Sequence, residues 1–167
     1  FKKDVYYRLL KNEKYNWRKL LLLSSAKLIK RLHILQKNTD TKVLIIDDTV
    51  EIKRGKFIEG SCRNLWNNKE HRTVKGLNIV SLNYSDCYTD MMLDFSINYN
   101  RNQIVNVNEN YFHHKSNAYK RRVEGNNSKN NLALQMVNRV LKSGIYADYL
   151  LVDSWYAKPN FIKEVND

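Results

Sequence analysis

The stretch TKVLIIDDTVEIKRGK, residues 41–56, decides the fold because it carries an apolar run directly into a pair of aspartates. Residues 43–46 are consecutive apolar side chains with β-branched character, which predicts a short strand buried on both faces of a sheet. Asp47 and Asp48 follow at the expected carboxyl end of this strand. Unpaired carboxylates near a core carry a large desolvation cost, so something must compensate them.

The composition of the 167-residue chain favours one packed domain with a polyanionic partner. The length suits a single domain, with or without a helical appendage. An apolar fraction of 43%, with 5 Phe, 3 Trp and 11 Tyr, excludes an intrinsically disordered chain. The formal net charge of +12 is large for this size, and it favours nucleic acid or an anionic membrane surface as the partner.

Several classes of protein are excluded by the pattern of cysteines and apolar residues. The two cysteines, Cys62 and Cys87, have a spacing that fits neither a zinc site nor a disulfide framework, which favours a reducing cytosol. No apolar stretch approaches the roughly 20 residues that span a bilayer. The chain starts without methionine and holds one proline, so we expect it to be an internal piece of a longer protein.

Residues 1–40 form a distinctly basic segment, with 11 Lys and Arg residues against three acidic ones. The pattern predicts helix over residues 4–36, interrupted near residues 12–16. The apolar residues that we expect on one helix face are Trp17, Leu21, Leu28, Leu32 and Leu35. Two interpretations stay open, a solvated basic face over a packed stripe and direct contact with DNA.

The residues after the first strand predict two more strands and a loop. A polar region at 53–69 precedes strand-like runs at about residues 72–82 and 88–99, which we expect to pair antiparallel. In the second run apolar residues alternate with polar ones, and this alternation places Asp94 toward solvent. Residues 100–131 lack periodicity and are rich in asparagine and basic residues, which predicts a long loop.

The last part of the chain predicts a helix, a strand and a second helix. Asn130 or Asn131 is the expected cap of the first helix, and Gly144 marks its end. An apolar strand follows that ends in Asp153, and Pro159 opens the last helix. The element order is therefore strand, strand, strand, helix, strand, helix.

This order indicates an α/β fold with the topology of an RNase H-like domain. The expected sheet is mixed, a three-stranded antiparallel meander plus one parallel strand, with helices flanking it. If the first and fourth strands are neighbours, Asp47 and Asp153 leave the sheet at the same end, on backbones about 4.8 Å apart. Carboxylates so close repel each other unless a cation is present. Oxygen ligands favour Mg²⁺ or Mn²⁺ over zinc, and paired ions of this kind can serve phosphoryl transfer.

Other interpretations of the aspartates stay open. Asp-Asp-Thr after a strand is also typical of a turn or a helix cap, and Asp153 followed by serine fits the same reading. A phosphatase with an aspartyl nucleophile is a third interpretation, although it expects Asp-any-Asp, whereas Asp47 and Asp48 are adjacent. The recurrence of an apolar strand ending in Asp, in a strongly basic chain, favours the metal site.

Four motifs resemble the DDE transposases of bacterial insertion sequences, which are DDE superfamily endonucleases. The motifs are IIDDT at residues 45–49, KRGK at 53–56, YKRR at 119–122 and LLVDSWY at 150–156, and KNEKYNWRKLLL at 11–22 extends the similarity toward the start. The resemblance implies an RNase H-like catalytic domain over residues 41–167 that is incomplete at its carboxyl end. It also implies that the basic helical segment, residues 1–40, is the end of an N-terminal DNA-binding region.

The resemblance further implies which residues form the site. Asp47 matches the first catalytic carboxylate, because the family keeps Asp, any residue, then Ser or Thr, and Thr49 fills the last place; Asp153 matches the second. In the family two Asp and one Glu hold two Mg²⁺ or Mn²⁺ ions that serve to cleave and rejoin DNA strands. The family's Glu lies in a later motif with Tyr, Arg and Lys, and the surroundings of Glu164 do not match that motif. We therefore expect DNA transposition by the complete protein and an inactive fragment.

The implied partner is double-stranded DNA, of the transposon ends and of the target, with no membrane, a homodimer on DNA and a bacterial, nucleoid-associated location. Five basic residues are the candidate phosphate contacts, with solvated loops as the alternative: Lys53, Arg54, Lys120, Arg121 and Arg122. Trp155 and Tyr156 are interpreted as packing residues rather than as platforms for bases. The alternative function is a non-catalytic DNA-binding remnant of a transposable element.

Overall fold

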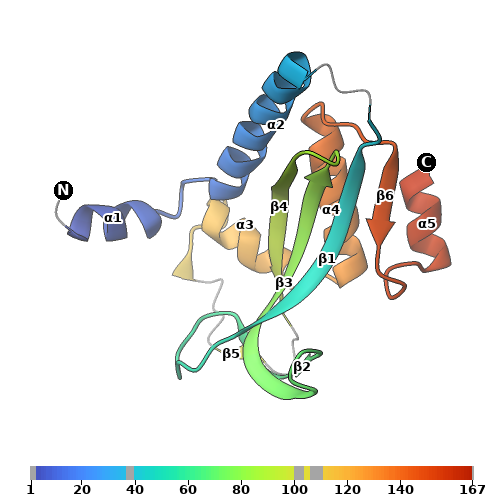
Figure 1. Cartoon of the computed structure of the whole chain (residues 1–167). Helices are drawn as coiled ribbons and strands as arrows, with labels where there is room; N and C mark the ends of the chain where they lie inside the picture. The colour runs from blue at the N-terminus through green and yellow to red at the C-terminus, as the bar shows by residue number, and fades with distance from the viewer. Residues whose placement is uncertain (1–2, 37–39, 100–103, 106–110, 167) are drawn as a thin grey trace.

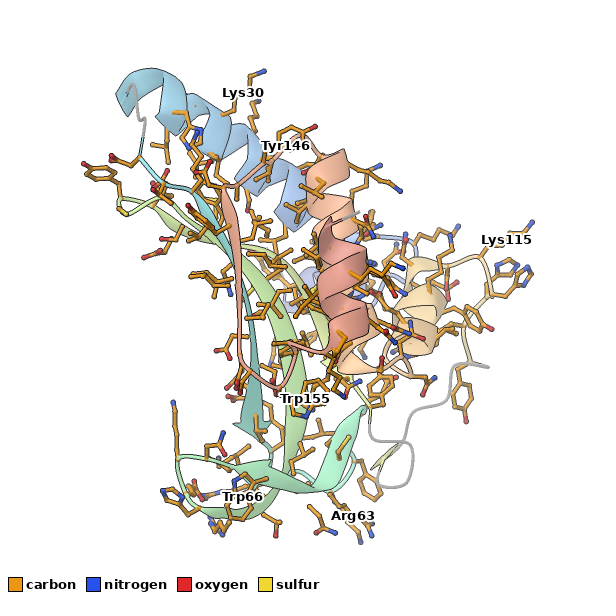
Figure 2. All side chains as sticks on the ribbon, turned by 90° about the vertical axis from the view of Figure 1, so that its right-hand side faces the viewer. Lys30, Arg63, Trp66, Lys115, Tyr146 and Trp155 are labelled. Carbon is orange, nitrogen blue, oxygen red and sulfur yellow. The ribbon has the colours of Figure 1, made fainter. Side chains whose placement is uncertain are left out.

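The computed structural model describes residues 3–36, 40–99, 104–105 and 111–166. The helices in these ranges are α1 (Lys3–Leu10), α2 (Trp17–Gln36), α3 (Asn117–Glu124), α4 (Lys129–Lys142) and α5 (Pro159–Asn166). The strands are β1 (Val43–Ile52), β2 (Ser61–Asn67), β3 (Arg72–Ser85), β4 (Asp90–Asn98), β5 (Ile104–Val105) and β6 (Tyr149–Val152). They form one mixed sheet, and α2, α4 and α5 lie on the same side of it (Figures 1 and 2).

The sheet has the predicted topology. β1 pairs antiparallel with β3, β3 pairs antiparallel with β4, and β6 returns to lie parallel to β1 on its other edge. The antiparallel meander plus one parallel strand of an RNase H-like fold is therefore confirmed. β2 pairs with the first part of β3, and β5 pairs with β2, so the described sheet is larger than the sequence indicated.

β1 differs from the expected strand in length and in burial. The strand does not end at the aspartates, because its pairing with β3 continues from Val43 opposite Ser85 to Ile52 opposite Gly76. Its burial alternates, so that one face is packed and the other is more open to solvent, and the prediction of a strand buried on both faces is wrong. Two adjacent aspartates in such a strand point to opposite faces of the sheet.

The core lies between the helix-covered face of the sheet and α4. Leu132, Met136 and Val140 of α4 are fully buried, at a spacing of four residues that places them on one stripe of the helix. They share this core with Val80 and Leu82 of β3. Complete burial of side chains of this size contributes about 1.5–3 kcal/mol each, which fixes α4 against the sheet.

The ends of α4 show one confirmed and one wrong prediction. Ser128 caps the helix, since its hydroxyl accepts a hydrogen bond from the backbone N–H of Asn131, so neither Asn130 nor Asn131 is the cap. Gly144 follows the helix with a φ of 82°, the left-handed conformation that the predicted stop requires. Lys129 therefore lies in the first turn, where it points toward β1.

The amino-terminal helices are interrupted at the predicted place, between α1 and α2. The packed face of α2 matches the predicted one only in part, since Leu21 and Leu32 are partly buried and the side chain of Leu35 lies outside the described residues. Leu22, Ser25 and Ile29 are buried, whereas Trp17 and Leu28 are exposed. The Ser25 hydroxyl donates a hydrogen bond to a carbonyl of β4, and Leu22 and Ile29 belong to the same core as α4. α2 thus packs directly on the sheet.

Two elements formed in segments that we expected to be irregular. β2 lies in the region that we described only as polar, and α3 lies in the expected long loop, with Ser116 as its cap. The rest of that loop includes residues 100–103 and 106–110, which lie outside the described residues. Hydrophobic periodicity could not reveal α3, because its buried residue is Glu124 rather than an apolar side chain.

A buried cluster of charges holds α2, α3, α4 and β4 together. Asp94 of β4 is fully buried, and its carboxylate pairs with Arg18 at 3.5 Å and with Arg139 at 2.7 Å. Glu124 pairs with Arg18, with Arg139 at 3.0 Å and with Arg121 at 3.3 Å. The prediction that Asp94 faces solvent is wrong, because a bulge in β4 beside it changes the alternation of the strand.

Candidate functional site

The register of β1 and β6 brings the two predicted carboxylates to adjacent positions. The parallel pairing runs from Val43 opposite Tyr149 to Ile46 opposite Val152. The next residue on each chain is an aspartate, Asp47 on β1 and Asp153 just after β6, and both are exposed. Residues in register on neighbouring parallel strands project from the same face, on backbones about 4.8 Å apart.

Local hydrogen bonds orient both carboxylates. One oxygen of Asp47 accepts a hydrogen bond from the backbone N–H of Asp48 at 2.8 Å. One oxygen of Asp153 accepts from the Ser154 hydroxyl at 3.0 Å and from the backbone N–H of Trp155 at 3.4 Å. Oδ1 of Asp153 receives both of these bonds, so the second oxygen of each carboxylate accepts no hydrogen bond from the described residues.

Asp48 lies on the other face of β1, with the core residues, and has its own compensating charge. Its carboxylate forms an ion pair with the Lys129 ammonium in the first turn of α4. It also accepts a hydrogen bond from the Tyr156 hydroxyl at 3.4 Å. Asp48 is therefore compensated by a lysine, whereas we expected a divalent metal cation to compensate the aspartates. Sequence reasoning gave Asp48 no role, although extending the strand alternation past residue 46 would have placed it beside the core.

Tyr156 lies beside Asp48 and senses the charges of all three aspartates. Its side chain is fully buried. Burial raises the pKa of this phenol, and the charge of Asp48, the hydrogen bond to Asp48 and the charges of Asp47 and Asp153 raise the pKa further. The hydroxyl therefore keeps its proton at neutral pH and remains a donor to Asp48.

The donor chemistry fits a divalent cation at Asp47 and Asp153, but the residues that the structure describes do not assemble a complete set of ligands. Carboxylate oxygens are the ligands that Mg²⁺ and Mn²⁺ prefer. Among the residues that the structure describes, no three His, Cys, Asp or Glu side chains are grouped as a metal site. Glu164 of α5 is exposed and does not complete such a group.

A comparison with protein-family models gives the family. The model described as DDE superfamily endonuclease matches residues 2–167, nearly the whole chain. The chain belongs to the DDE superfamily endonucleases. This membership supports a transposase-like nuclease that acts on DNA, in a family that generally uses divalent metal ions. Neither a curated protein nor a solved structure matches the chain. In the described ranges, no helix combines the length and the apolarity needed to cross a membrane.

Two of the predicted DNA contacts in this DDE superfamily endonuclease are engaged inside the fold. Arg121 donates a hydrogen bond to the carbonyl of Phe95 at 2.8 Å, in addition to its place in the buried charge cluster. Burial lowers the pKa of its guanidinium. Arg122 pairs with Glu59 through both arms of its guanidinium and lies over the Phe112 ring. These contacts hold α3 in place and leave less of either guanidinium for a phosphate.

The other three predicted contacts are more accessible. Arg54 and Lys120 are exposed, and Lys53 is partly exposed and pairs with Glu51 at 3.1 Å. Such an exposed pair is worth little in free energy, and a phosphate can compete for the lysine. Contact with DNA by these residues remains a prediction.

The two aromatic residues after Asp153 have different environments. Tyr156 is a packing residue, as predicted, and it contacts Phe161 of α5. Trp155 is not, because 49% of its surface is exposed. Two ammonium groups lie over its indole ring, Lys129 at 5.3 Å and Lys158 at 4.7 Å from the ring centre. An exposed indole with cations on it lies directly beside the candidate metal site.

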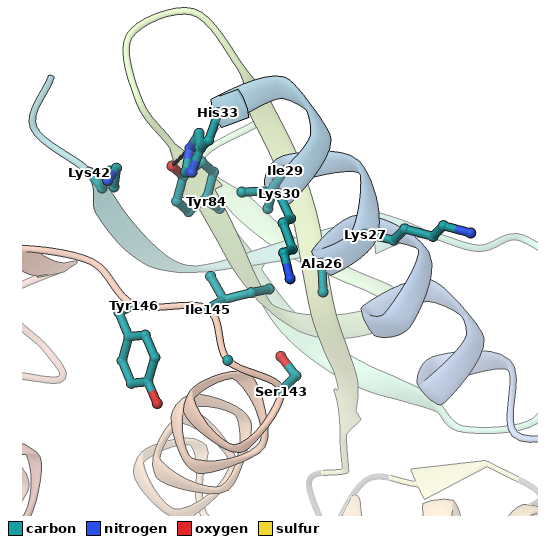
Figure 3. Close-up of a pocket in the computed structure, with 11 residues that line it drawn as sticks. Ala26, Lys27, Ile29, Lys30, His33, Lys42, Tyr84, Ser143, Ile145 and Tyr146 are labelled. Carbon is teal, nitrogen blue, oxygen red and sulfur yellow. Dashed lines mark hydrogen bonds between the residues drawn. The ribbon is translucent and has the colours of Figure 1, made fainter. Parts of the chain in front are cut away.

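A separate pocket of about 730 Å³ lies between α2 and the end of α4, and it contains none of the three aspartates (Figure 3). His33 of α2 contacts the Tyr84 hydroxyl at 2.7 Å and the Asp86 carboxylate at 3.2 Å there. Burial raises the pKa of Asp86, but hydrogen bonds from the backbone of Thr89 and Tyr88 and from His33 and Tyr84 outweigh it and hold the pKa below its ordinary value. These contacts fix the carboxyl-terminal half of α2 to β3.

Proposed function

We propose that this chain carries the metal-binding carboxylates of a transposase that cleaves and rejoins DNA strands by phosphoryl transfer, of the kind found in bacterial insertion sequences. The substrate is double-stranded DNA, at the transposon ends and at the target. Asp47 and Asp153 are the metal ligands. The observation that carries the proposal is the parallel register of β1 and β6, which supports adjacent positions for these two aspartates in a chain of the DDE superfamily.

The chain's own residues prepare the site for this chemistry. Divalent ions, when bound, would stabilise the attacking and leaving oxygens of an in-line displacement at phosphorus. The hydrogen bonds from residues 48, 154 and 155 orient the carboxylates of Asp47 and Asp153. Lys129 and Tyr156 hold Asp48, which therefore adds less negative charge to the pair. A strongly basic surface attracts the DNA.

Calorimetric titration with Mn²⁺ tests the ligand assignment. We expect the chain to bind Mn²⁺ weakly, and Asp47→Asn and Asp153→Asn each to abolish the heat of binding. Asp90→Asn, at an exposed carboxylate on β4, is the matched control and should bind as the unmodified chain does. Mn²⁺ binding that survives in both site variants would refute the assignment.

Strand cleavage is the second measurement. In any form of the protein that nicks supercoiled DNA, Asp153→Asn should abolish nicking and leave DNA binding nearly intact. Full nicking by this variant would contradict the proposal.

A non-catalytic DNA-binding remnant is the second candidate function. It is favoured by the finding that the described residues group no third carboxylate or histidine with the pair. DNA binding without any Mn²⁺ binding, in the same two measurements, would support it over the enzyme.

A further inference from the structure

A groove of about 750 Å³ lies beside the candidate site and is lined by amide side chains. Five of its lining residues are asparagines: Asn78, Asn98, Asn126, Asn127 and Asn131. The groove shares Lys129 and Trp155 with the surroundings of the carboxylates. Its size is within the range of about 300–1,000 Å³ that is typical of sites for small molecules. A nucleotide or two fits such a space, whereas a DNA duplex does not.

The groove and the carboxylate Asp48 lie on the same face of the sheet. Val80 of β3 is the cross-strand partner of Asp48, and Asn78 is two residues away on the same strand. Residues two apart in a strand project from the same face. The groove therefore lies on the helix-covered face, opposite the exposed face of Asp47, and Trp155, which lines the groove and whose backbone N–H donates to Asp153, connects it with the candidate site.

Asn78 carries a buried polar atom that has no partner in the described part of the chain. The residue is 8% exposed, and its Oδ1 makes no hydrogen bond to any described residue. Buried polar atoms almost always have a partner, so this amide oxygen at the wall of the groove can accept a hydrogen bond from a donor on a bound ligand. The exocyclic amino groups of DNA bases are such donors, and asparagine is well suited to base edges.

Trp155 provides an aromatic surface at the same groove. Its indole is half exposed, and its backbone N–H donates to Asp153. Aromatic faces of this kind stack unpaired bases with little regard to sequence, and neighbouring lysines hold the backbone phosphates. Lys129 and Lys158 supply the positive charge over the ring.

We propose that this groove binds one unpaired strand of DNA next to the phosphate at Asp47 and Asp153. The bases stack on Trp155, and the asparagines form hydrogen bonds with base edges. This inference rests on the proposed function, since it names how the substrate of the same site is held.

Fluorescence anisotropy with the full chain tests the groove. The probes are a labelled single-stranded oligonucleotide and a hairpin duplex of the same sequence, at one fixed salt concentration and with EDTA, so that metal binding does not contribute. Trp155→Ala should weaken binding of the single strand at least about fivefold, since stacking on one aromatic residue contributes roughly that much or more. Binding of the duplex should change less than about twofold. Trp66→Ala is the matched control, at a tryptophan of β2 that is 57% exposed and lies outside the groove (Figure 2).

Asn78→Leu separates a binding role from a structural one. Leucine is close to asparagine in shape and has no polar atom to satisfy, so the variant should unfold at the same or higher urea concentration and still bind the single strand at least about fivefold more weakly. A structural asparagine would instead lose stability and keep its affinity. Asn131→Asp, which places a negative charge in the groove, should also weaken binding, whereas Asn138→Asp, at an exposed position of α4 outside it, should not.

The outcomes distinguish this inference from the proposed function. Two results would overturn the proposal that the groove binds a single strand: an unchanged affinity of Trp155→Ala for the single strand, or equal losses of affinity for the single strand and the duplex. Neither result would affect the Mn²⁺ and cleavage measurements. Failure of the metal assignment would appear instead in the calorimetric titration, as Mn²⁺ binding that survives in both Asp47→Asn and Asp153→Asn, whatever the anisotropy measurements give.

Discussion

The buried charge cluster makes a strong prediction about stability, because Arg139 serves two buried carboxylates at once. Its Nε lies 2.7 Å from Asp94 and its Nη2 lies 3.0 Å from Glu124. Asp94 is fully buried and Glu124 is 8% exposed. Arg139→Met keeps most of the aliphatic packing of the side chain and removes the charge.

The expected loss can be worked out from this geometry. Removing one partner of a buried ion pair costs about 3–5 kcal/mol, because the other charge remains buried. Arg18 still contacts both carboxylates and Arg121 still contacts Glu124, so the lower end, about 3 kcal/mol, applies. With a urea dependence of about 2 kcal/mol per molar for a domain of this size, the unfolding midpoint should fall by about 1.5 M.

Urea unfolding followed by tryptophan fluorescence measures this midpoint. Arg63→Met, at an exposed arginine of β2, is the control and should leave the midpoint unchanged. The double variant Asp94→Leu with Arg139→Met should recover part of the loss, since the buried charge of Asp94 is removed together with its partner. A fall of less than about 0.5 M in Arg139→Met would refute the reasoning, because it would mean that the two carboxylates do not depend on this guanidinium.

Three further predictions concern the sheet and the two carboxylates that are held by tyrosines. Gly76→Ala should cost about 2 kcal/mol or more in urea unfolding, because the added Cβ would lie 2.4 Å from the carbonyl oxygen of Glu51 and backbone cannot easily move aside. The pKa of Asp86 lies below its ordinary value of about 3.9, so its carboxylate stabilises the fold above that pH. This stabilisation is lost as the pH falls through the lowered pKa. The unfolding free energy, measured from neutral pH down to about pH 2, should therefore fall less steeply in Asp86→Asn than in the unmodified chain. Tyr156→Phe should lower the unfolding free energy by about 1 kcal/mol, through loss of the hydroxyl that donates to Asp48, and no change would contradict this hydrogen bond.

The topology could be predicted because the strands that define it are either continuously apolar or alternate between apolar and polar residues. The run at residues 43–46 and the strand before Asp153 are short apolar segments, and the order of elements left few ways to connect them. β2 and α3 could not be predicted in the same way. β2 is rich in polar residues, and α3 is held by Ser116 and by ion pairs to partners distant in sequence, which no local pattern encodes.

The face of α2 shows a second limit of pattern reading. Apolar residues lie on all sides of this helix, so the sequence predicts several possible buried faces. The contacts of α2 with the rest of the fold determine which face is buried. Two contacts set the rotation of the helix: Arg18 pairs with two buried carboxylates, and the Ser25 hydroxyl donates a hydrogen bond to β4. As a result, Leu22 and Ile29 face the core. Trp17 and Leu28 are left exposed as a result.

The two adjacent aspartates of β1 have different surroundings because side chains alternate between the two faces of a strand. The sequence predicted a strand that ends at Asp47, whereas the pairing with β3 continues and sends consecutive side chains to opposite faces. Asp48 enters the helix-covered face, where Lys129 neutralises it and Tyr156 donates to it. Asp47 stays on the exposed side in register with Asp153, where no lysine pairs with it among the described residues. The two carboxylates are thus compensated differently, with a lysine for Asp48 and, under the proposed function, a metal cation for Asp47 and Asp153. A shift of the register by one residue would exchange the faces of Asp47 and Asp48, so the ten-residue pairing of β1 with β3 is what keeps Asp47 on the exposed face.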